Sequence, residues 1–171
     1  MPTSPFAQLI VMGVSGSGKT TLGQELAAYY GCPFLDADDL HTPDAKAKMA
    51  RGEGLTDADR APWLARLRDA LDEHAAGGVV LACSALKASY RAVLCGPQTG
   101  FVYLNVPHDV LRSRLEARQG SYAKVSLLPS QLAALEEPAP DEAITVQVGA
   151  DETPDLVLAD ALRQLDGKRG G

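Results

Sequence analysis

The sequence contains little of what several common classes of protein require. Its only cysteines, Cys32, Cys83 and Cys95, are isolated, lack the spacing of metal ligands and fit buried thiols in a reducing compartment. Lysine and arginine total 16 against 22 acidic residues, so the net charge is −6. This balance argues against a nucleic-acid partner, because phosphate contacts need clustered basic side chains.

Membrane and multidomain signals are also lacking. The first residues have no basic leader region, and no apolar run reaches the length of a membrane span, so we expect a cytoplasmic protein without membrane contacts. Internal repeats and linkers of biased composition are missing too. We therefore expect residues 1–171 to form a single domain.

What the chain does contain is an alternation of short apolar runs with segments of helical spacing. This pattern predicts an α/β fold, a parallel sheet covered by helices on both faces. The expected strands lie at 8–12, 32–38, 79–84, 101–106 and 143–148. The expected helices start near residues 19, 42, 56, 85, 107, 127 and 155, and glycines at 31 and 77 end two of them.

The segment GVSGSGKT, residues 13–20, matches the phosphate-binding pattern G-x-x-x-x-G-K-[ST]. Glycines let backbone amides surround the phosphates, Lys19 would span the β- and γ-phosphates of ATP, and the Thr20 hydroxyl would ligate Mg²⁺. A glycine-rich turn that binds nothing is the alternative. The position between an expected strand and an expected helix favours phosphate binding. The expected ATP-binding residues here are Gly13, Ser15, Gly16, Ser17, Gly18, Lys19, Thr20 and Thr21.

Acidic residues distinguish a kinase from a hydrolase in this sequence. Nucleotide hydrolases usually carry an acid for Mg²⁺ after the third strand, where this chain has Ala-Cys-Ser, and the guanine-reading N-K-x-D pattern is missing. Asp36 and Asp38 instead follow the second expected strand, at the sheet edge that also carries the phosphate loop. Asp36 would face the metal and Asp38 an acceptor hydroxyl. A solvated acidic turn is the alternative, but phosphoryl transfer to a small molecule is favoured.

Basic residues follow in the segment RSRLEARQG. Arg114 and Arg118 lie four residues apart on one helical face, where one could stack on adenine and the other neutralise the transferring phosphoryl group. An exposed basic helix end is an equally good explanation of this segment alone. The following QGSYAK is expected to form a mobile flap, within a lid at about 114–130, that excludes water.

Several of these stretches together resemble the gluconate kinases, small P-loop enzymes that phosphorylate the 6-hydroxyl of D-gluconate. The specific segments are DADDLHTPDAKAKMARGEGLTDADRAPWL and CSALKASYR, and the resemblance extends from about residue 11 to residue 148. It implies a P-loop kinase fold with five parallel strands, ATP and Mg²⁺ as cofactors, a sugar acid as substrate and a homodimer. More distantly, the layout is similar to shikimate kinase.

The resemblance also implies roles for individual residues. Asp36 is placed near Mg²⁺, Asp38 acts as a base, and Arg114 and Arg118 face the nucleotide. The residues around the sugar acid are Asp38, His41, Lys48, Arg60, Trp63, Lys87 and Arg91. A sugar acid needs cations for its carboxylate, and among these the arginines at 60 and 91 are favoured because guanidinium binds carboxylate bidentately.

The sequence departs from the family at three positions and leaves alternatives open. Ala45 stands where the family commonly has Asn, Gly54 where it has Pro, and Ser121 where it has a flap His. These changes affect the choice of acceptor more than the expected chemistry. The expected catalytic residues are Lys19, Asp38 and Arg118. The alternatives are a kinase for another small acid such as shikimate, and a nucleotide-binding regulatory module without catalysis.

Overall fold

The computed structural model describes residues 2–117 and 122–168, and the side chains of 122–127 are left out of this description. Five strands form one sheet in the order β2-β3-β1-β4-β5, and every neighbouring pair is parallel. The five-stranded parallel sheet expected from the sequence is thus confirmed. The strands are β1 (Gln8–Met12), β2 (Phe34–Asp36), β3 (Val79–Ala82), β4 (Thr99–Asn105) and β5 (Ala143–Gln147).

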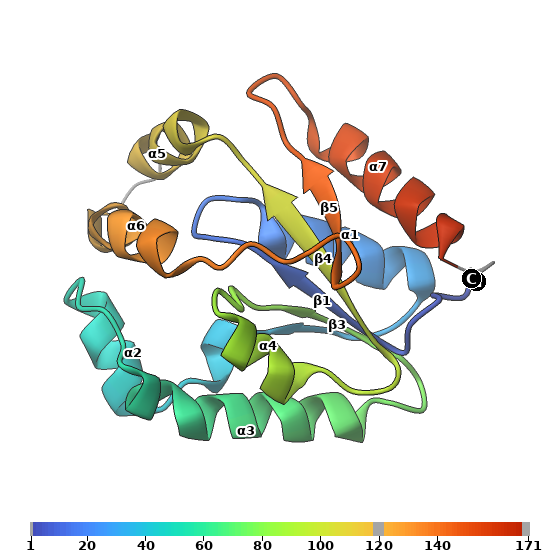
Figure 1. Ribbon diagram of the computed structural model, residues 1–171, viewed down its shortest axis with the longest axis horizontal. Helices are drawn as coiled ribbons and strands as arrows, with labels where there is room; N and C mark the ends of the chain where they lie inside the picture. The colour runs from blue at the N-terminus through green and yellow to red at the C-terminus, as the bar shows by residue number, and fades with distance from the viewer. Residues whose placement is uncertain (1, 118–121, 169–171) are drawn as a thin grey trace.

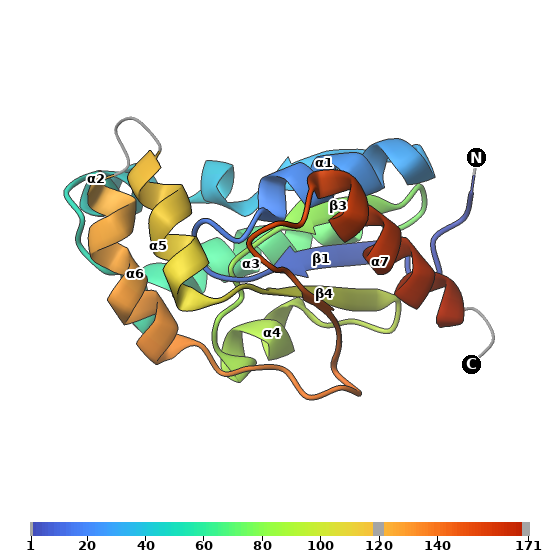
Figure 2. The same cartoon turned by 90° about the horizontal axis from the view of Figure 1, so that it is seen from above.

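Helices cover both faces of this sheet (Figures 1 and 2). They are α1 (Lys19–Tyr30), α2 (Pro43–Ala50), α3 (Asp57–Glu73), α4 (Ala88–Leu94), α5 (His108–Ala117), α6 (Tyr122–Ala134) and α7 (Pro154–Gly167), with a short 3₁₀ helix η1 at Ala37–Leu40. Helices α2, α5 and α6 gather at the end of the sheet toward which the strand arrows point in Figure 1. The carboxyl ends of the strands therefore face the site described below.

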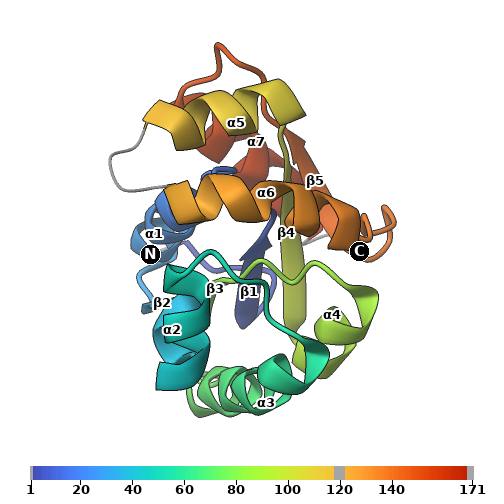
Figure 3. The same cartoon turned by 90° about the vertical axis from the view of Figure 1, so that its left-hand side faces the viewer.

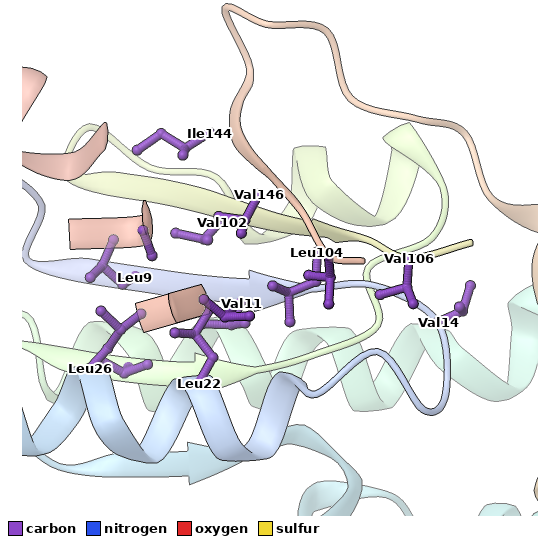
Figure 4. Close-up of a cluster of buried hydrophobic side chains, with 14 of the residues drawn as sticks. Leu9, Val11, Val14, Leu22, Leu26, Val102, Leu104, Val106, Ile144 and Val146 are labelled. Carbon is purple, nitrogen blue, oxygen red and sulfur yellow. The ribbon is translucent and has the colours of Figure 1, made fainter. Parts of the chain in front are cut away.

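The alternation of side chains along β1 divides the core into two layers, because successive residues of a strand point to opposite faces. Leu9 and Val11 pack with α1 and α7 (Figure 4). Ile10 and Met12 pack with α3 and α4 on the other face. Since both faces are covered, the strand is apolar from Leu9 to Met12 rather than half polar.

Local capping explains where the helices near the site begin. The Thr56 hydroxyl accepts from the Asp59 amide at 3.1 Å, and the Asp59 carboxylate accepts from the Thr56 amide at 2.9 Å, a reciprocal capping box at the start of α3. Helix α3 ends at Glu73, four residues before the expected glycine stop at Gly77. Gly78, with φ of 87°, makes the left-handed turn that leads into β3.

The lid segment differs from its expected form. Helix α6 begins at Tyr122 and continues through Pro129, although the sequence predicts a flap over residues 119–124 and a helix only from about residue 127. Packing of α6 against α5 overrides the helix-breaking tendency of that proline. Part of the expected flap is therefore helical. Residues 118–121 lie outside the described residues, and the mobility of the lid stays a prediction.

Candidate active site

The loop between β1 and α1 is shaped by three glycines. Gly13, Gly16 and Gly18 all have positive φ, at 151°, 84° and 97°. A Cβ atom on Gly13 would lie 2.8 Å from the Ser17 Oγ and 3.1 Å from the Leu104 carbonyl oxygen, so no larger residue fits there. The backbone thus takes the curled conformation in which its amides can surround an anion.

Two polar side chains of this loop are poised for an anionic ligand. The Ser17 hydroxyl is buried and has no hydrogen-bond partner among the described residues. The Lys19 ammonium donates to the Val14 carbonyl at 3.1 Å, which keeps it folded back over the loop. A buried hydroxyl without a partner is costly, and phosphate oxygens would satisfy it.

A cavity of about 710 Å³ joins the loop to the acidic and aromatic residues expected around the substrate. Residues far apart in the sequence line it together, as the expected site requires. The predicted residues among its lining are Ser15, Gly16, Gly18, Lys19, Thr20, Thr21, Asp36, Asp38, His41, Arg60 and Trp63. A phosphate donor on the loop and an acceptor held by the opposite wall would meet in one space.

The two acids lie at the turn from β2 into η1. The Asp36 carboxylate accepts from the Asp38 amide at 3.0 Å, which caps η1 and leaves the Asp38 side chain at the cavity wall. Burial raises the pKa of Asp36, and the neighbouring Asp38 and Asp39 charges raise it further, whereas that amide and Lys19 lower it. A bound cation would relieve this crowding of negative charge.

His41 and Trp63 form the apolar part of the acceptor wall. Their rings stack with centroids 4.1 Å apart and planes 11° from parallel. The indole N–H donates to the Ala37 carbonyl at 2.7 Å, so the pair is fixed to the turn that carries the acids. His41 Nδ1 is buried without a partner among the described residues, and burial lowers the pKa of His41. A neutral imidazole is therefore available to a substrate hydroxyl.

Besides Lys19 of the phosphate loop, two cations line this cavity, and one of them was missed by sequence reasoning. Arg60 donates to the Leu55 carbonyl at 2.8 Å and to the Tyr90 hydroxyl at 3.1 Å, contacts that orient its guanidinium. Lys46 also lines the cavity and donates to the Asp39 carbonyl at 3.3 Å. Lys46 was missed because on a short helix such as α2 the sequence alone does not show which of two nearby lysines faces inward.

The other three expected cations do not line this cavity. Lys48 pairs with Asp59 at 2.9 Å, and Lys87 with Asp57 at 3.2 Å. Arg91 is 2% exposed; it donates to the Ala85 and Leu86 carbonyls at 2.9 and 3.2 Å and pairs with Glu142. Its guanidinium therefore supports the chain after β3 through Nη1 and pairs with Glu142 through Nε.

A second cavity, of about 350 Å³, lies on the other side of the phosphate loop. Arg114 on α5 lines it together with Glu25, Pro154 and Val157, and its guanidinium donates to the Gly16 carbonyl at 3.3 Å. A cavity with apolar side chains and an arginine in its wall suits a nucleotide base. Arg118 and Ser121, both expected in the lid, lie outside the described residues.

Gln131 on α6 is a further residue that the sequence did not reveal. Its side chain lines the larger cavity and exchanges two hydrogen bonds with Ser15, 116 positions earlier in the chain. Its polarity was the only signal in the sequence, and glutamine side chains are usually solvent-exposed.

The site has no dedicated all-protein metal cage. Among the described residues no group of three His, Cys, Asp or Glu side chains could hold a metal ion. Mg²⁺ bound with a nucleotide usually needs only one or two protein ligands beside phosphate oxygens and water, and Thr20 and Asp36 on one cavity fit that arrangement.

Within residues 2–117 and 122–168, no helix has the length and apolar character needed to span a membrane.

Comparison with known proteins assigns the chain to a family. The family model described as shikimate kinase matches residues 15–166. The gluconokinase of Gluconobacter oxydans (strain 621H) is 47% identical over 161 residues, which are 92% of this chain and 90% of that protein. The chain belongs to the gluconokinase family. The thermoresistant gluconokinase of Escherichia coli (strain K12) is 41% identical, with 91% of each chain covered.

Solved structures agree with this family assignment. A gluconokinase from Sinorhizobium meliloti 1021 superposes with a TM-score of 0.87 at 38% identity, covering 99% of this chain and 96% of that one. Shikimate kinase from Aquifex aeolicus superposes with a TM-score of 0.62 at 20% identity, covering 96% of this chain and 99% of that one, and shows the P-loop kinase fold alone. The expected resemblance to gluconate kinases and the expected fold are both confirmed.

Proposed function

We propose that this protein transfers the γ-phosphate of ATP to the 6-hydroxyl of D-gluconate, giving 6-phospho-D-gluconate and ADP. The observation that carries the proposal is the single cavity lined by Lys19 of the phosphate loop, by Asp38 and by Arg60. The family supports the same acceptor, since its named relatives are gluconokinases. A regulatory module without catalysis would have no need to keep these three groups in one cavity.

The proposed chemistry assigns one task to each group. Asp38 accepts the proton of the 6-hydroxyl while that oxygen forms a bond to the γ-phosphorus. The bond from phosphorus to the β–γ bridging oxygen breaks, and Lys19 stabilises the negative charge that develops there. Catalysis of this kind depends mainly on positioning and charge stabilisation, and the two groups lie on α1 and η1, which follow β1 and β2.

We propose Mg²⁺ as the metal of this reaction, with Thr20 and Asp36 as its protein contacts. The cation neutralises phosphate charge when bound. Burial and neighbouring acids raise the pKa of Asp36, so a cation there would favour its ionised form. The base of ATP is proposed to occupy the smaller cavity beside Arg114, and Arg118 stays a prediction as the lid arginine.

The carboxylate of gluconate is proposed to bind Arg60, with Lys46 as a second cation. Arg60 supplies a fixed, planar donor that matches a carboxylate. His41 Nδ1, buried and without a partner among the described residues, would bond to a sugar hydroxyl. Lys48, Lys87 and Arg91 are left to structural ion pairs.

The test is a coupled assay of ADP release over a panel of acceptors at fixed ATP. We expect turnover with gluconate, none with glucose, which lacks the carboxylate, and little with shikimate. Lys19→Ala serves as the control that abolishes transfer with every acceptor. Comparable rates with gluconate and glucose would refute the carboxylate argument, and turnover only with shikimate would assign the other acceptor.

A further inference from the structure

Helix α6 is tied to the phosphate loop by one pair of polar side chains. The Gln131 Oε1 accepts from the Ser15 amide at 2.8 Å, and the Gln131 Nε2 donates to the Ser15 Oγ at 2.9 Å. Figure 3 shows α6 lying across the end of the sheet above α2. The pair is partly buried and joins segments 116 positions apart, so it forms only when this helix is docked.

We propose that Gln131 is a positioning residue for phosphoryl transfer, which sets the apex of the phosphate loop through Ser15 and closes the wall of the acceptor cavity. The inference rests on the proposed function. The Gln131 carboxamide lines the same cavity as Lys19 and Asp38, so it lies at the place where donor and acceptor meet. No other assigned residue of the site belongs to α6 in the described part of the chain.

The docking of α6 does not itself require this polar pair. Leu128, one turn earlier on α6, is 3% exposed and packs in the same core cluster as Val14 of the loop. Apolar contacts of this kind hold a helix in place without fixing a neighbouring backbone. Two hydrogen bonds to one residue add direction, because both weaken when Ser15 rotates or shifts away from Gln131.

Gly16, the next residue of the loop, is held by a different helix, α5. Arg114 of α5 donates to the Gly16 carbonyl, and a Cβ atom on Gly16 would lie 3.1 Å from Leu115. Ser15 and Gly16 are therefore held by two different helices, α6 and α5, and these contacts together form a clamp on the loop. A misplacement of about 1 Å at a reacting centre can cost roughly a hundredfold in rate, so the clamp bears on kcat more than on stability.

Gln131→Met tests the proposal because methionine retains the length of the side chain and removes both hydrogen bonds. We expect kcat to fall about tenfold, within the range of two net hydrogen bonds, while KM for ATP and for the acceptor changes less than about threefold. The matched control is Gln164→Met on α7, which also loses two hydrogen bonds, to Thr145 and Asp160, far from the cavity. It should retain the wild-type kcat with a similar change in Tm.

Two further measurements separate positioning from a general loss of structure. Ser15→Ala removes only the Oγ bond of this pair, so the loss of kcat in the double variant Ser15→Ala/Gln131→Met should be smaller than the product of the two single losses. Amide exchange of the loop residues 13–18 in the ligand-free protein should be faster in Gln131→Met and unchanged in the control. This readout needs no acceptor, so it still tests the Ser15 pairing if gluconate proves not to be the substrate.

The outcomes that overturn the proposal are equally definite. The proposal fails if Gln131→Met retains the wild-type kcat or if Gln164→Met loses as much kcat. It also fails if the losses in the double variant multiply, or if amide exchange of the loop is unchanged. A loss confined to KM for the acceptor would make Gln131 a binding contact and would contradict the positioning role.

Discussion

Asp38 is the residue on which the proposed chemistry depends most directly. Asp38→Asn retains the shape of the side chain but cannot take up the hydroxyl proton, so we expect kcat to fall by roughly 10²–10⁴-fold with ATP affinity unchanged. Steady-state kinetics and calorimetric titration of ATP measure the two quantities. A normal kcat with a raised KM would instead make Asp38 a residue that positions the acceptor, as a loose transition state allows.

In the proposed function, Arg60 is the residue that gives specificity for a carboxylate. Arg60→Ala should raise KM for gluconate by about 10–100-fold, the cost of one charged hydrogen bond or more, and leave KM for ATP near its normal value. Arg66→Ala is the matched control, because Arg66 lies on the same helix, bonds to the Leu40 carbonyl at 3.0 Å and does not line the cavity. Equal effects of the two substitutions would remove Arg60 from the substrate site.

At the scale of elements, α4 supports the site through Arg91. Its guanidinium satisfies the Ala85 and Leu86 carbonyls, and Ala85 has a left-handed φ of 46° that few non-glycine residues adopt. We expect Arg91→Ala to lower the free energy of unfolding by roughly 1–3 kcal/mol, measured by urea denaturation, without a selective rise in KM for gluconate.

An exposed arginine provides the control for this prediction. Arg51 pairs with Glu53 on the surface, with side chains 57% and 52% exposed, and Arg51→Ala should leave stability nearly unchanged. If Arg91→Ala instead unfolds normally and binds gluconate poorly, Arg91 belongs to the acceptor site after all, as the family resemblance implies.

At the scale of the whole molecule, His41 makes stability depend on pH. Burial lowers the pKa of His41, the Arg60 and Lys46 charges lower it further, and the Asp38 charge opposes them. The unfolded chain therefore binds this proton at a higher pH than the folded one, so stability falls as the pH drops below about 6.5. We expect Tm to decrease between pH 7.5 and 5.5.

The comparison variant for the pH prediction is His41→Phe. Phenylalanine can retain the stacking on Trp63 but does not titrate, so its Tm should decrease less over the same range. Parallel profiles of the two proteins would mean that other groups cause the decrease. The homodimer that the family resemblance implies is a separate expectation at this scale and stays a prediction.

Much of this molecule was determined by the sequence alone. The spacing of glycines between a strand and a helix is a local property, so residues 13–20 predict their own conformation and their ligand class without tertiary contacts. The alternation of apolar runs and helical segments likewise predicts the parallel sheet. A helix between two strands carries the chain back to the end of the sheet where the first strand began, so the next strand runs in the same direction. For the same reason Asp36 and Asp38 follow a strand end and line one cavity with the loop, while their roles stay predictions.

The tertiary structure decided which side chains face the cavity. Lys48 and Lys87 pair with acidic residues of α3, and Arg91 donates to buried carbonyls. Arg60 and Lys46 lie on the cavity wall. The orientation of a cationic side chain depends on which acceptor lies near it in the folded protein, and that acceptor can come from any part of the chain. The pairing of Gln131 with Ser15 is the extreme case: it depends on how α6 lies on the loop, and no local pattern encodes a contact over 116 positions.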